Sequence, residues 1–124
     1  MIDHMSTYAT DYPATRAFYE AVLSPLGYQV VMEFPDMCAF GPPDNPIFWV
    51  IQAKEPVSPR HWAFAAGDRE MVTHFYHAGL KQGGEDHGPP GLRPQYHEHY
   101  YGAFLLDPDG NNVEAVCHMP EEPE

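Results

Sequence analysis

Three side chains capable of acid–base or metal chemistry occupy unusual positions in this sequence. His4 and His61 begin two similar segments, residues 4–27 and 61–84. Glu114 lies in VEAVC, an otherwise apolar run. An acidic side chain that faces the interior of a sheet needs a cation or a hydrogen-bond partner. These residues are therefore the first candidates for a functional site, and the elements around them must bring them together.

The two similar segments form an internal repeat. A shift of 57 residues aligns eight identities within 24 positions. The pairs are His4 with His61, Ala9 with Ala66, Asp11 with Asp68, Phe18 with Phe75, Tyr19 with Tyr76, Ala21 with Ala78, Leu23 with Leu80 and Gly27 with Gly84. In an internal repeat, each copy is normally one supersecondary unit. The same order of elements is therefore expected in both halves of the chain.

Each copy is predicted to run from a strand into a helix. A short run begins at the histidine, and Asp11 or Asp68 follows as a helix cap. Amphipathic stretches over residues 13–26 and 69–82 then end at glycines.

Short strand-like segments follow each predicted helix. They cover residues 27–34, 37–41 and 47–53 in the first half and 100–106 and 111–118 in the second. Residues 85–99 are so rich in Gly and Pro that an irregular insert is expected there. The sequence thus predicts an α+β fold of two βαβββ modules.

Length and composition limit the organisation and the partners. One domain is expected over 1–118, made of two repeats at about 1–54 and 58–118, followed by a solvated acidic tail at 119–124. With 18 acidic and 6 basic residues, the net charge is −12, which repels nucleic acid and anionic lipid. No segment resembles a signal peptide or a membrane span, so a cytoplasmic protein is expected.

The repeat and its motifs resemble the vicinal oxygen chelate superfamily, which includes glyoxalase I, bleomycin resistance proteins and extradiol dioxygenases. The specific pieces are the two histidine-initiated strands, the Phe-Tyr helices and the run DPDGNNVEAV. The resemblance implies that the two modules form a curled mixed-sheet cup that holds a divalent metal and a small-molecule substrate. It also implies a homodimer, in which the cup forms either within one chain or across two.

The resemblance places metal ligands at His4, His61 and Glu114. The fourth position used by glyoxalase-like members falls on Trp49, which cannot bind a metal. Two histidines and one carboxylate suit Fe(II), although Mn, Zn or Ni could occupy such a site. Taken singly, however, a strand-borne histidine is more often structural than a ligand.

Catalytic residues are expected in PQYHEHYY. In extradiol enzymes a histidine and a tyrosine that follow the second ligand transfer protons and orient the substrate. His97 or His99, with Tyr100 or Tyr101, matches that order along the chain. The alternative is an aromatic rim around the mouth of the cup.

The expected function is a metal-dependent enzyme that acts on a small substrate with adjacent oxygens, with a dioxygenase-like site. Two alternatives remain open. One is a lyase or isomerase of the glyoxalase type. The other is metal-free binding and sequestration of a drug, as in bleomycin resistance proteins, and an acidic protein would attract such cationic ligands.

Overall fold

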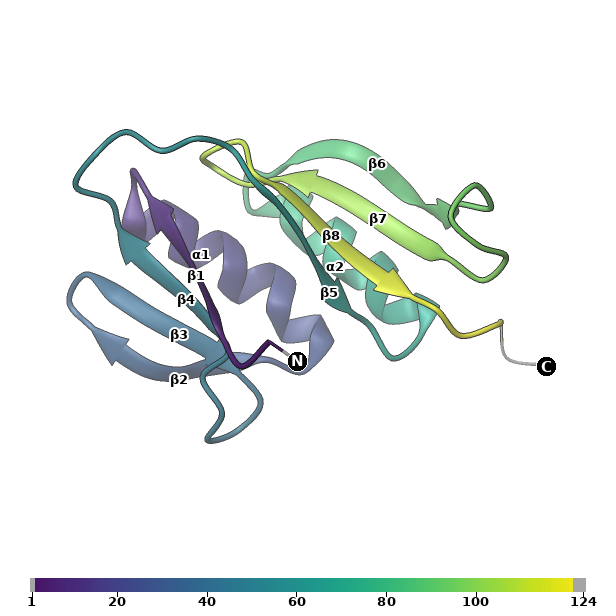
Figure 1. Cartoon of the computed structure of the whole chain (residues 1–124), viewed down its shortest axis with the longest axis horizontal. Helices are drawn as coiled ribbons and strands as arrows, with labels where there is room; N and C mark the ends of the chain where they lie inside the picture. The colour runs from purple at the N-terminus through teal and green to yellow at the C-terminus, as the bar shows by residue number, and fades with distance from the viewer. Residues whose placement is uncertain (1, 122–124) are drawn as a thin grey trace.

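The computed structural model describes residues 2–121 as two consecutive βαβββ modules (Figure 1). The first contains β1 (Met5–Ala9), α1 (Tyr12–Leu23), a 3₁₀ turn η1 (Ser24–Leu26), β2 (Gln29–Phe34), β3 (Met37–Gly41) and β4 (Phe48–Gln52). The second contains β5 (His61–Ala65), α2 (Arg69–Lys81), β6 (Glu85–Leu92), β7 (Tyr101–Leu106) and β8 (Asn112–Cys117). The predicted α+β fold of two modules is confirmed.

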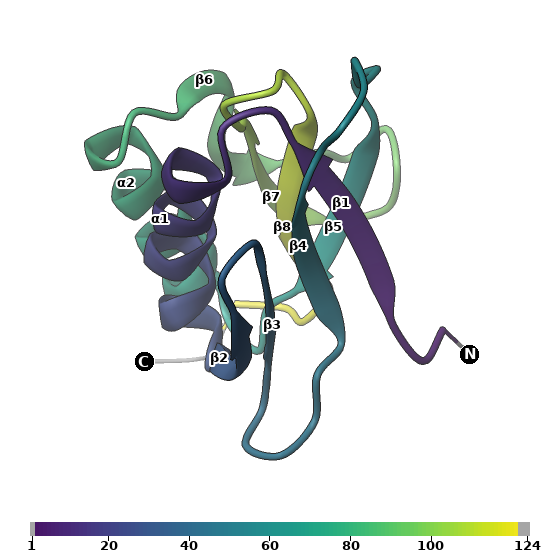
Figure 2. The ribbon, with the colours of Figure 1, turned by 90° about the vertical axis from the view of Figure 1, so that its left-hand side faces the viewer.

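Each module builds a four-stranded mixed sheet. The strand orders are β1-β4-β3-β2 and β5-β8-β7-β6, and the first and last strands of each module pair in parallel. Both helices lie on the same side of the two sheets (Figures 1 and 2). In the described part of the chain, no helix covers the opposite side of either sheet, which is called its open face below.

The helices begin where the sequence predicts. Asp11 accepts a hydrogen bond from the Ala14 amide at 3.2 Å, and Asp68 accepts one from the Met71 amide at 2.8 Å. These caps satisfy amide groups that a helix leaves free in its first turn. The first helix ends earlier than expected, because Ser24–Leu26 tighten into η1 before Gly27 turns the chain with a φ of 88°.

One continuous hydrophobic core joins the two modules. Phe48 of β4 lies edge-on to Phe64 of β5, with ring centroids 5.2 Å apart, and contacts the ring of Tyr19 on α1 at 4.8 Å. A second link is polar, since the buried Tyr19 hydroxyl donates to Oδ2 of Asp107 at 2.5 Å. The modules are therefore held together by packing between their helices and inner sheet faces.

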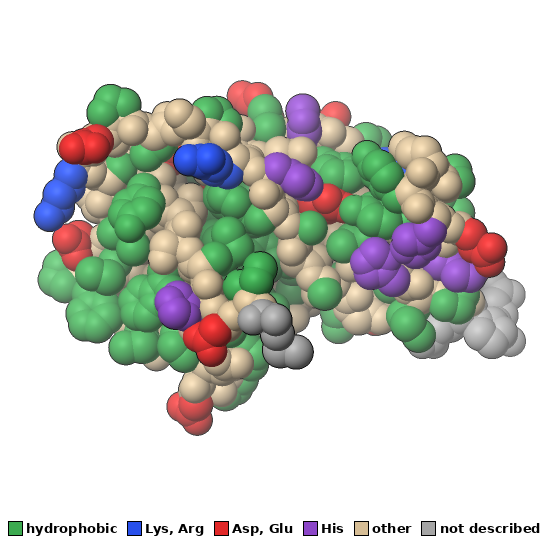
Figure 3. All heavy atoms as spheres, in the orientation of Figure 1, with side chains coloured by type: hydrophobic (Ala, Val, Ile, Leu, Met, Phe, Trp, Pro, Cys, Tyr) green, Lys and Arg blue, Asp and Glu red, His purple; other side chains and the backbone are tan. Residues whose placement is uncertain are grey.

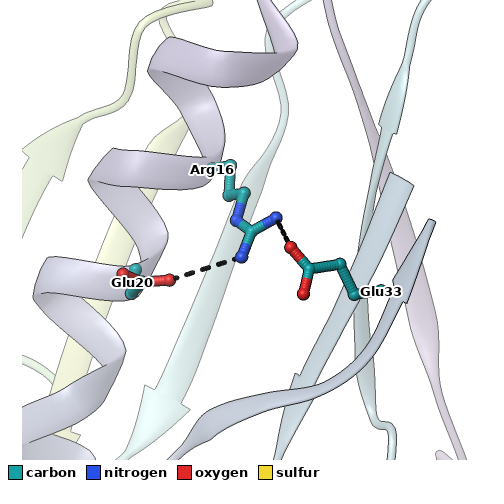
Figure 4. Close-up of polar contacts among 3 residues, drawn as sticks. All are labelled: Arg16, Glu20 and Glu33. Atoms are coloured by element: carbon teal, nitrogen blue, oxygen red, sulfur yellow. Dashed lines mark hydrogen bonds and ion pairs between the residues drawn. The ribbon is translucent and has the colours of Figure 1, made fainter. Parts of the chain in front are cut away.

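A charged contact fixes α1 against the edge strand of its own sheet. Arg16 on α1 forms an ion pair with Glu33 on β2 (Figure 4). It also lies 3.8 Å from Glu20, one turn along the helix. Exposed pairs of this kind contribute roughly 0.2–1 kcal/mol, so this cluster orients the helix more than it stabilises the fold.

The expected irregular insert at 85–99 is wrong for its first part. Glu85–Leu92 forms β6, an edge strand paired antiparallel with β7 through two register shifts. Gly88, with a φ of 152°, lies at the first of these irregularities. Bulges and an edge position allow a strand to contain Pro89 and Pro90, because a proline there need not donate to the ladder.

Three further features are the cysteines, the absence of a membrane-spanning helix among the described residues and the C-terminal tail. Cys38 and Cys117 are buried and free. No helix within residues 2–121 is long and apolar enough to cross a membrane. The last part of the predicted acidic tail, 122–124, lies outside the described residues.

Candidate functional site

Strand alternation places His61 and Glu114 together on the open face of the second sheet. On β5, Phe64 enters the core, whereas His61 and Ala63 face away from the helices. Glu114 on β8 pairs in register with Ala63, so its side chain lies on the same face. Glu114 is nevertheless only 2% exposed. A buried carboxylate of this kind must be compensated by its neighbours.

The imidazole of His61 bridges a backbone carbonyl and the Glu114 carboxylate. Its Nδ1 lies 2.9 Å from the carbonyl oxygen of Asn112, which can only accept a hydrogen bond, so Nδ1 carries the hydrogen. Its Nε2 lies 3.3 Å from Oε1 of Glu114. A neutral ring with hydrogen on Nδ1 presents a lone pair to that oxygen. A cation beside these two acceptors, such as a metal ion, would be stabilised by both of them.

Tyr100 contacts the second carboxylate oxygen of Glu114. Its hydroxyl donates to Oε2 of Glu114. Burial raises the pKa of Tyr100 above its ordinary value of 10.0, and the hydrogen bond and charge of Glu114 raise it further. Tyr100 consequently stays a protonated donor at neutral pH.

Gly102 leaves room for this contact. A Cβ on Gly102 would lie 3.2 Å from Cε1 of Tyr100 and 3.4 Å from Oε2 of Glu114.

His4 lies on the open face of the first sheet. Its side chain is 58% exposed, and its Nδ1 lies 2.7 Å from Oδ1 of Asp3. It lines a hollow of about 410 Å³ beside Trp49 and Ile51. Within residues 2–121, no three His, Cys, Asp or Glu side chains gather as a metal site, so one chain does not bring His4 to His61 and Glu114.

The four residues of 97–101 that the sequence offers as catalytic candidates have different surroundings in the structure. Tyr100 touches Glu114, and its ring lies edge-on to His97 at 5.5 Å. His99 instead faces Glu98 at 2.9 Å, and Tyr101 lies under the guanidinium of Arg69. Figure 3 shows histidine side chains gathered at the β7–β8 end of the open face.

His118 is an addition that the sequence does not indicate. Its Nδ1 lies 2.6 Å from Nε2 of His97, and its ring lies edge-on to that of Tyr100 at 5.3 Å. The rings of His97 and His118 are within 25° of parallel, with centroids 4.8 Å apart. This edge-to-edge arrangement fits an N–H···N hydrogen bond that fixes His97 beside Tyr100.

The family follows from a comparison of the sequence with family models. The model described as "Glyoxalase/Bleomycin resistance protein/Dioxygenase superfamily" matches residues 1–115. The chain belongs to this superfamily. No curated protein matches the chain in sequence.

Solved structures of the superfamily share the fold over almost the whole chain. A glyoxalase/bleomycin resistance protein from Albidiferax ferrireducens T118 is 27% identical with a TM-score of 0.82, covering 92% of this chain and 96% of that one. A lactoylglutathione lyase from Agrobacterium tumefaciens is 21% identical with a TM-score of 0.70, covering 94% and 92%. The oxidase ChaP-H1 is 22% identical with a TM-score of 0.68, covering 99% and 96%. At these lower identities the likeness shows the fold alone.

Membership in the glyoxalase/dioxygenase superfamily does not determine the reaction, because one fold hosts different chemistries. The activity must be argued from the site. Imidazole nitrogen and carboxylate oxygen are ligands for Fe, Mn, Zn and Ni. The buried carboxylate and the oriented Nε2 of His61 fit such an ion, and they provide two of the three expected donors.

Proposed function

We propose that the protein is a metal-dependent enzyme acting on a small substrate with adjacent oxygens, through a dioxygenase-like site of two histidines and one glutamate. His61 and Glu114 of one chain and His4 of a second copy would hold the metal, with Fe(II) as the first candidate. The observation that carries the proposal is the pair of acceptors, Nε2 of His61 and Oε1 of Glu114, held 3.3 Å apart. The carbonyl of Asn112 fixes the ring so that the lone pair of Nε2 is available to a metal.

The position of His4 supports assembly of the site across two copies. His4 and the His61–Glu114 pair lie on different sheets and do not gather within one chain. The open face of the first sheet also exposes large apolar side chains, with Tyr8 at 53%, Met32 at 40% and Phe34 at 43%. An apolar face of this kind favours an interface. A homodimer would cover it and bring His4 to the partner's pair.

The side chains around Glu114 suggest how the site would work. A divalent metal, when bound, would polarise the two adjacent oxygens of the substrate. Tyr100 would hold Oε2 of Glu114 and so fix the direction of the carboxylate, because its raised pKa keeps the hydroxyl protonated. His97, held by His118 next to Tyr100, would exchange a proton with the substrate at the rim of the site.

Metal content measured by elemental analysis tests this proposal. Purified protein should contain about one iron or manganese per chain, which His4→Ala, His61→Ala and Glu114→Ala should each lose. His74→Ala is the matched control, because His74 is 60% exposed on α2 and faces only Glu70. No metal after reconstitution, or metal retained in the three variants, would refute the proposed site.

A mixed dimer tests the assembly. Differently tagged copies carrying His4→Ala and Glu114→Ala can be combined and the heterodimer isolated. If the site forms across copies, one of its two sites contains an intact His4, His61 and Glu114, and half of the metal returns. If each site forms within one chain, neither site is intact and no metal returns.

Metal-free binding, as in bleomycin resistance proteins, is the second candidate function. One observation favours it: both oxygens of Glu114 already have partners, and a protonated His61 would supply a cation without a metal. Lyase or isomerase chemistry of the glyoxalase type remains the alternative if metal binds but substrate turnover proves independent of oxygen.

A further inference from the structure

A cavity of about 730 Å³ lies between the two modules, where the link from β4 to β5 passes over the ends of β1 and β4. This volume falls within the range of about 300–1,000 Å³ that is usual for small-molecule sites. Its lining includes side chains from both modules, among them Tyr8, Ile51 and Trp62. None of these residues belongs to the proposed metal set.

Two cations line this cavity in a strongly acidic protein. The other four basic residues are engaged elsewhere: Arg16 with Glu33 and Glu20, Arg69 with Glu121, Arg93 with the carbonyls of Pro89 and Gly91, and Lys81 in the last turn of α2. Lys54 and Arg60 line the cavity, and within residues 2–121 neither forms an ion pair. Figure 3 shows two separate basic side chains on this face, one of them at the edge of the molecule beside an acidic side chain.

The local charge of the cavity opposes that of the whole molecule. Glu55 is the acidic residue of the lining, so its ionisable side chains sum to +1, whereas the chain carries −12. The general field of the protein attracts cations. A preference for an anion here would therefore come from Lys54 and Arg60 themselves.

The rest of the lining suits the body of an aromatic ligand. Tyr8, Trp62, Ile51 and Val57 supply aromatic and aliphatic surface. A guanidinium matches a carboxylate through two parallel hydrogen bonds. Among residues 2–121, no side chain or carbonyl takes up the guanidinium donors of Arg60, whose hydrogen bond to Asn111 comes from its backbone amide. We propose that this cavity binds a small aromatic carboxylate, with Arg60 holding the carboxylate and Lys54 adding positive charge.

The cavity adjoins the hollow that contains His4, because Ser6 and Ile51 line both. A ligand bound by Arg60 would extend along β1 toward His4. The substrate class implied is an aromatic acid whose carboxylate is distant from its adjacent oxygens. This assignment as substrate rests on the proposed function, whereas carboxylate binding in the cavity does not.

Binding of size-matched probes to metal-free protein tests the proposal. Benzoate, benzamide and benzylamine differ mainly in charge, and the indole N–H signals of Trp49 and Trp62 report binding by NMR, with Trp49→Phe giving the assignment. Benzoate should shift the Trp62 signal and bind at least about tenfold more tightly than either other probe. Arg60→Gln should remove most of that preference, and Lys81→Gln, which changes the net charge equally but lies outside the lining, should preserve it.

Three results would overturn the inference: benzylamine binding as tightly as benzoate, unchanged benzoate affinity in Arg60→Gln, or no benzoate binding at millimolar concentration. Each of these is independent of metal content. If the protein binds metal normally but does not bind benzoate, the carboxylate site is wrong and the proposed metal site is unaffected. Benzoate binding by a protein that never takes up metal would reject the proposed function and leave the carboxylate site.

Discussion

The open faces of the two sheets differ although their strands correspond one to one. Trp49 pairs with Ser6 in the first sheet, and Glu114 pairs with Ala63 in the second. Ser6 and Ala63 are 57 residues apart, so an indole and a buried carboxylate occupy equivalent places. The register thus supports the alignment that leaves the first module without a carboxylate ligand.

The histidines of the two modules differ in the same way. His61 lies against a backbone carbonyl and a buried carboxylate, while the polar contact of His4 within residues 2–121 is with its exposed neighbour Asp3. The repeat therefore retains what makes each module fold, namely the capped helix and the strand pairing. It diverges on the open faces, where one module offers a polar pair and the other an apolar surface with a single imidazole. Function here depends on side chains added to a common scaffold.

The join between the modules should be the most sensitive feature. Phe48→Ala removes a fully buried ring that contacts Tyr19, Trp62 and Phe64, and should lower the free energy of unfolding by about 3–5 kcal/mol. Leu80→Ala, at a 39% exposed position on α2 and away from both open faces, is the control and should cost well under half as much. Urea denaturation measures both. Equal losses of unfolding free energy in the two variants would mean that the packing of Phe48 between the modules contributes little to the stability of the fold.

Glu114→Gln makes the second module resemble the first by removing its carboxylate charge. Metal affinity should fall by more than the roughly 10- to 100-fold typical of losing an outer-shell partner, because a ligand itself is lost. Glu98→Gln, at a side chain 82% exposed, should leave metal affinity unchanged. Titration of apo-protein with Fe(II) or Mn(II) gives both values. Unchanged affinity in Glu114→Gln would remove the carboxylate from the site.

The fold could be predicted largely because the repeat presents its pattern twice. Both Asp caps and a strand at the start of each module follow from residue order. The second strand begins at His61 as expected, whereas the first begins at Met5, one residue after His4. β6 could not be predicted, because Gly88, Pro89 and Pro90 break every local strand pattern. It exists through its ladder with β7, a tertiary contact that residue types do not encode locally.

The site could be predicted only in part, for a related reason. The approach of His61 to Glu114 follows from strand order within one module. Choosing Tyr100 over Tyr101 required the path of the chain from β6 to β7, which the sequence does not fix. His118 and Gly102 act through distances of a few ångströms across strands, and no spacing in the sequence marks them.

Gly79→Ala tests how closely the two helices pack against each other. Gly79 on α2 and Val22 on α1 are equivalent repeat positions, and a Cβ on Gly79 would lie 2.9 Å from Cγ1 of Val22 and 2.3 Å from Cδ1 of Leu105. Overpacking at this point should cost about 1–3 kcal/mol, measured by urea denaturation. Gly67→Ala is the control, because its Cβ would meet only Met71 at 3.6 Å. A stable Gly79→Ala would mean that the helices separate easily.

Tyr100→Phe has the smallest expected effect and separates the polar face from the apolar one. It leaves Oε2 of Glu114 without its donor, which should cost about 1 kcal/mol at pH 8, because Tyr100 is only half-buried. Folding raises the pKa of Tyr100, so the protonated hydroxyl contributes its full stabilisation to the folded protein at pH values below 10, the pKa of a tyrosine in the unfolded chain. This contribution is lost as the pH rises from that value toward the higher pKa of Tyr100 in the folded protein. The wild-type protein should therefore lose more stability than Tyr100→Phe between pH 9 and about 11.

Tyr96→Phe provides the matched control, since Tyr96 is 61% exposed and its ring also contacts Tyr100. Tyr96 adds less to the raised pKa of Tyr100 than burial and Glu114 do, so this variant should stay close to the wild-type pH profile. The raised pKa values of Tyr12, Tyr19, Tyr28 and Tyr76 remain in every variant and cancel in the comparison. Parallel profiles for Tyr100→Phe and the wild type would show that Glu114 does not depend on the hydroxyl. In that case His61 alone would compensate the buried carboxylate, and the polar face of the second sheet would reduce to a single ion pair.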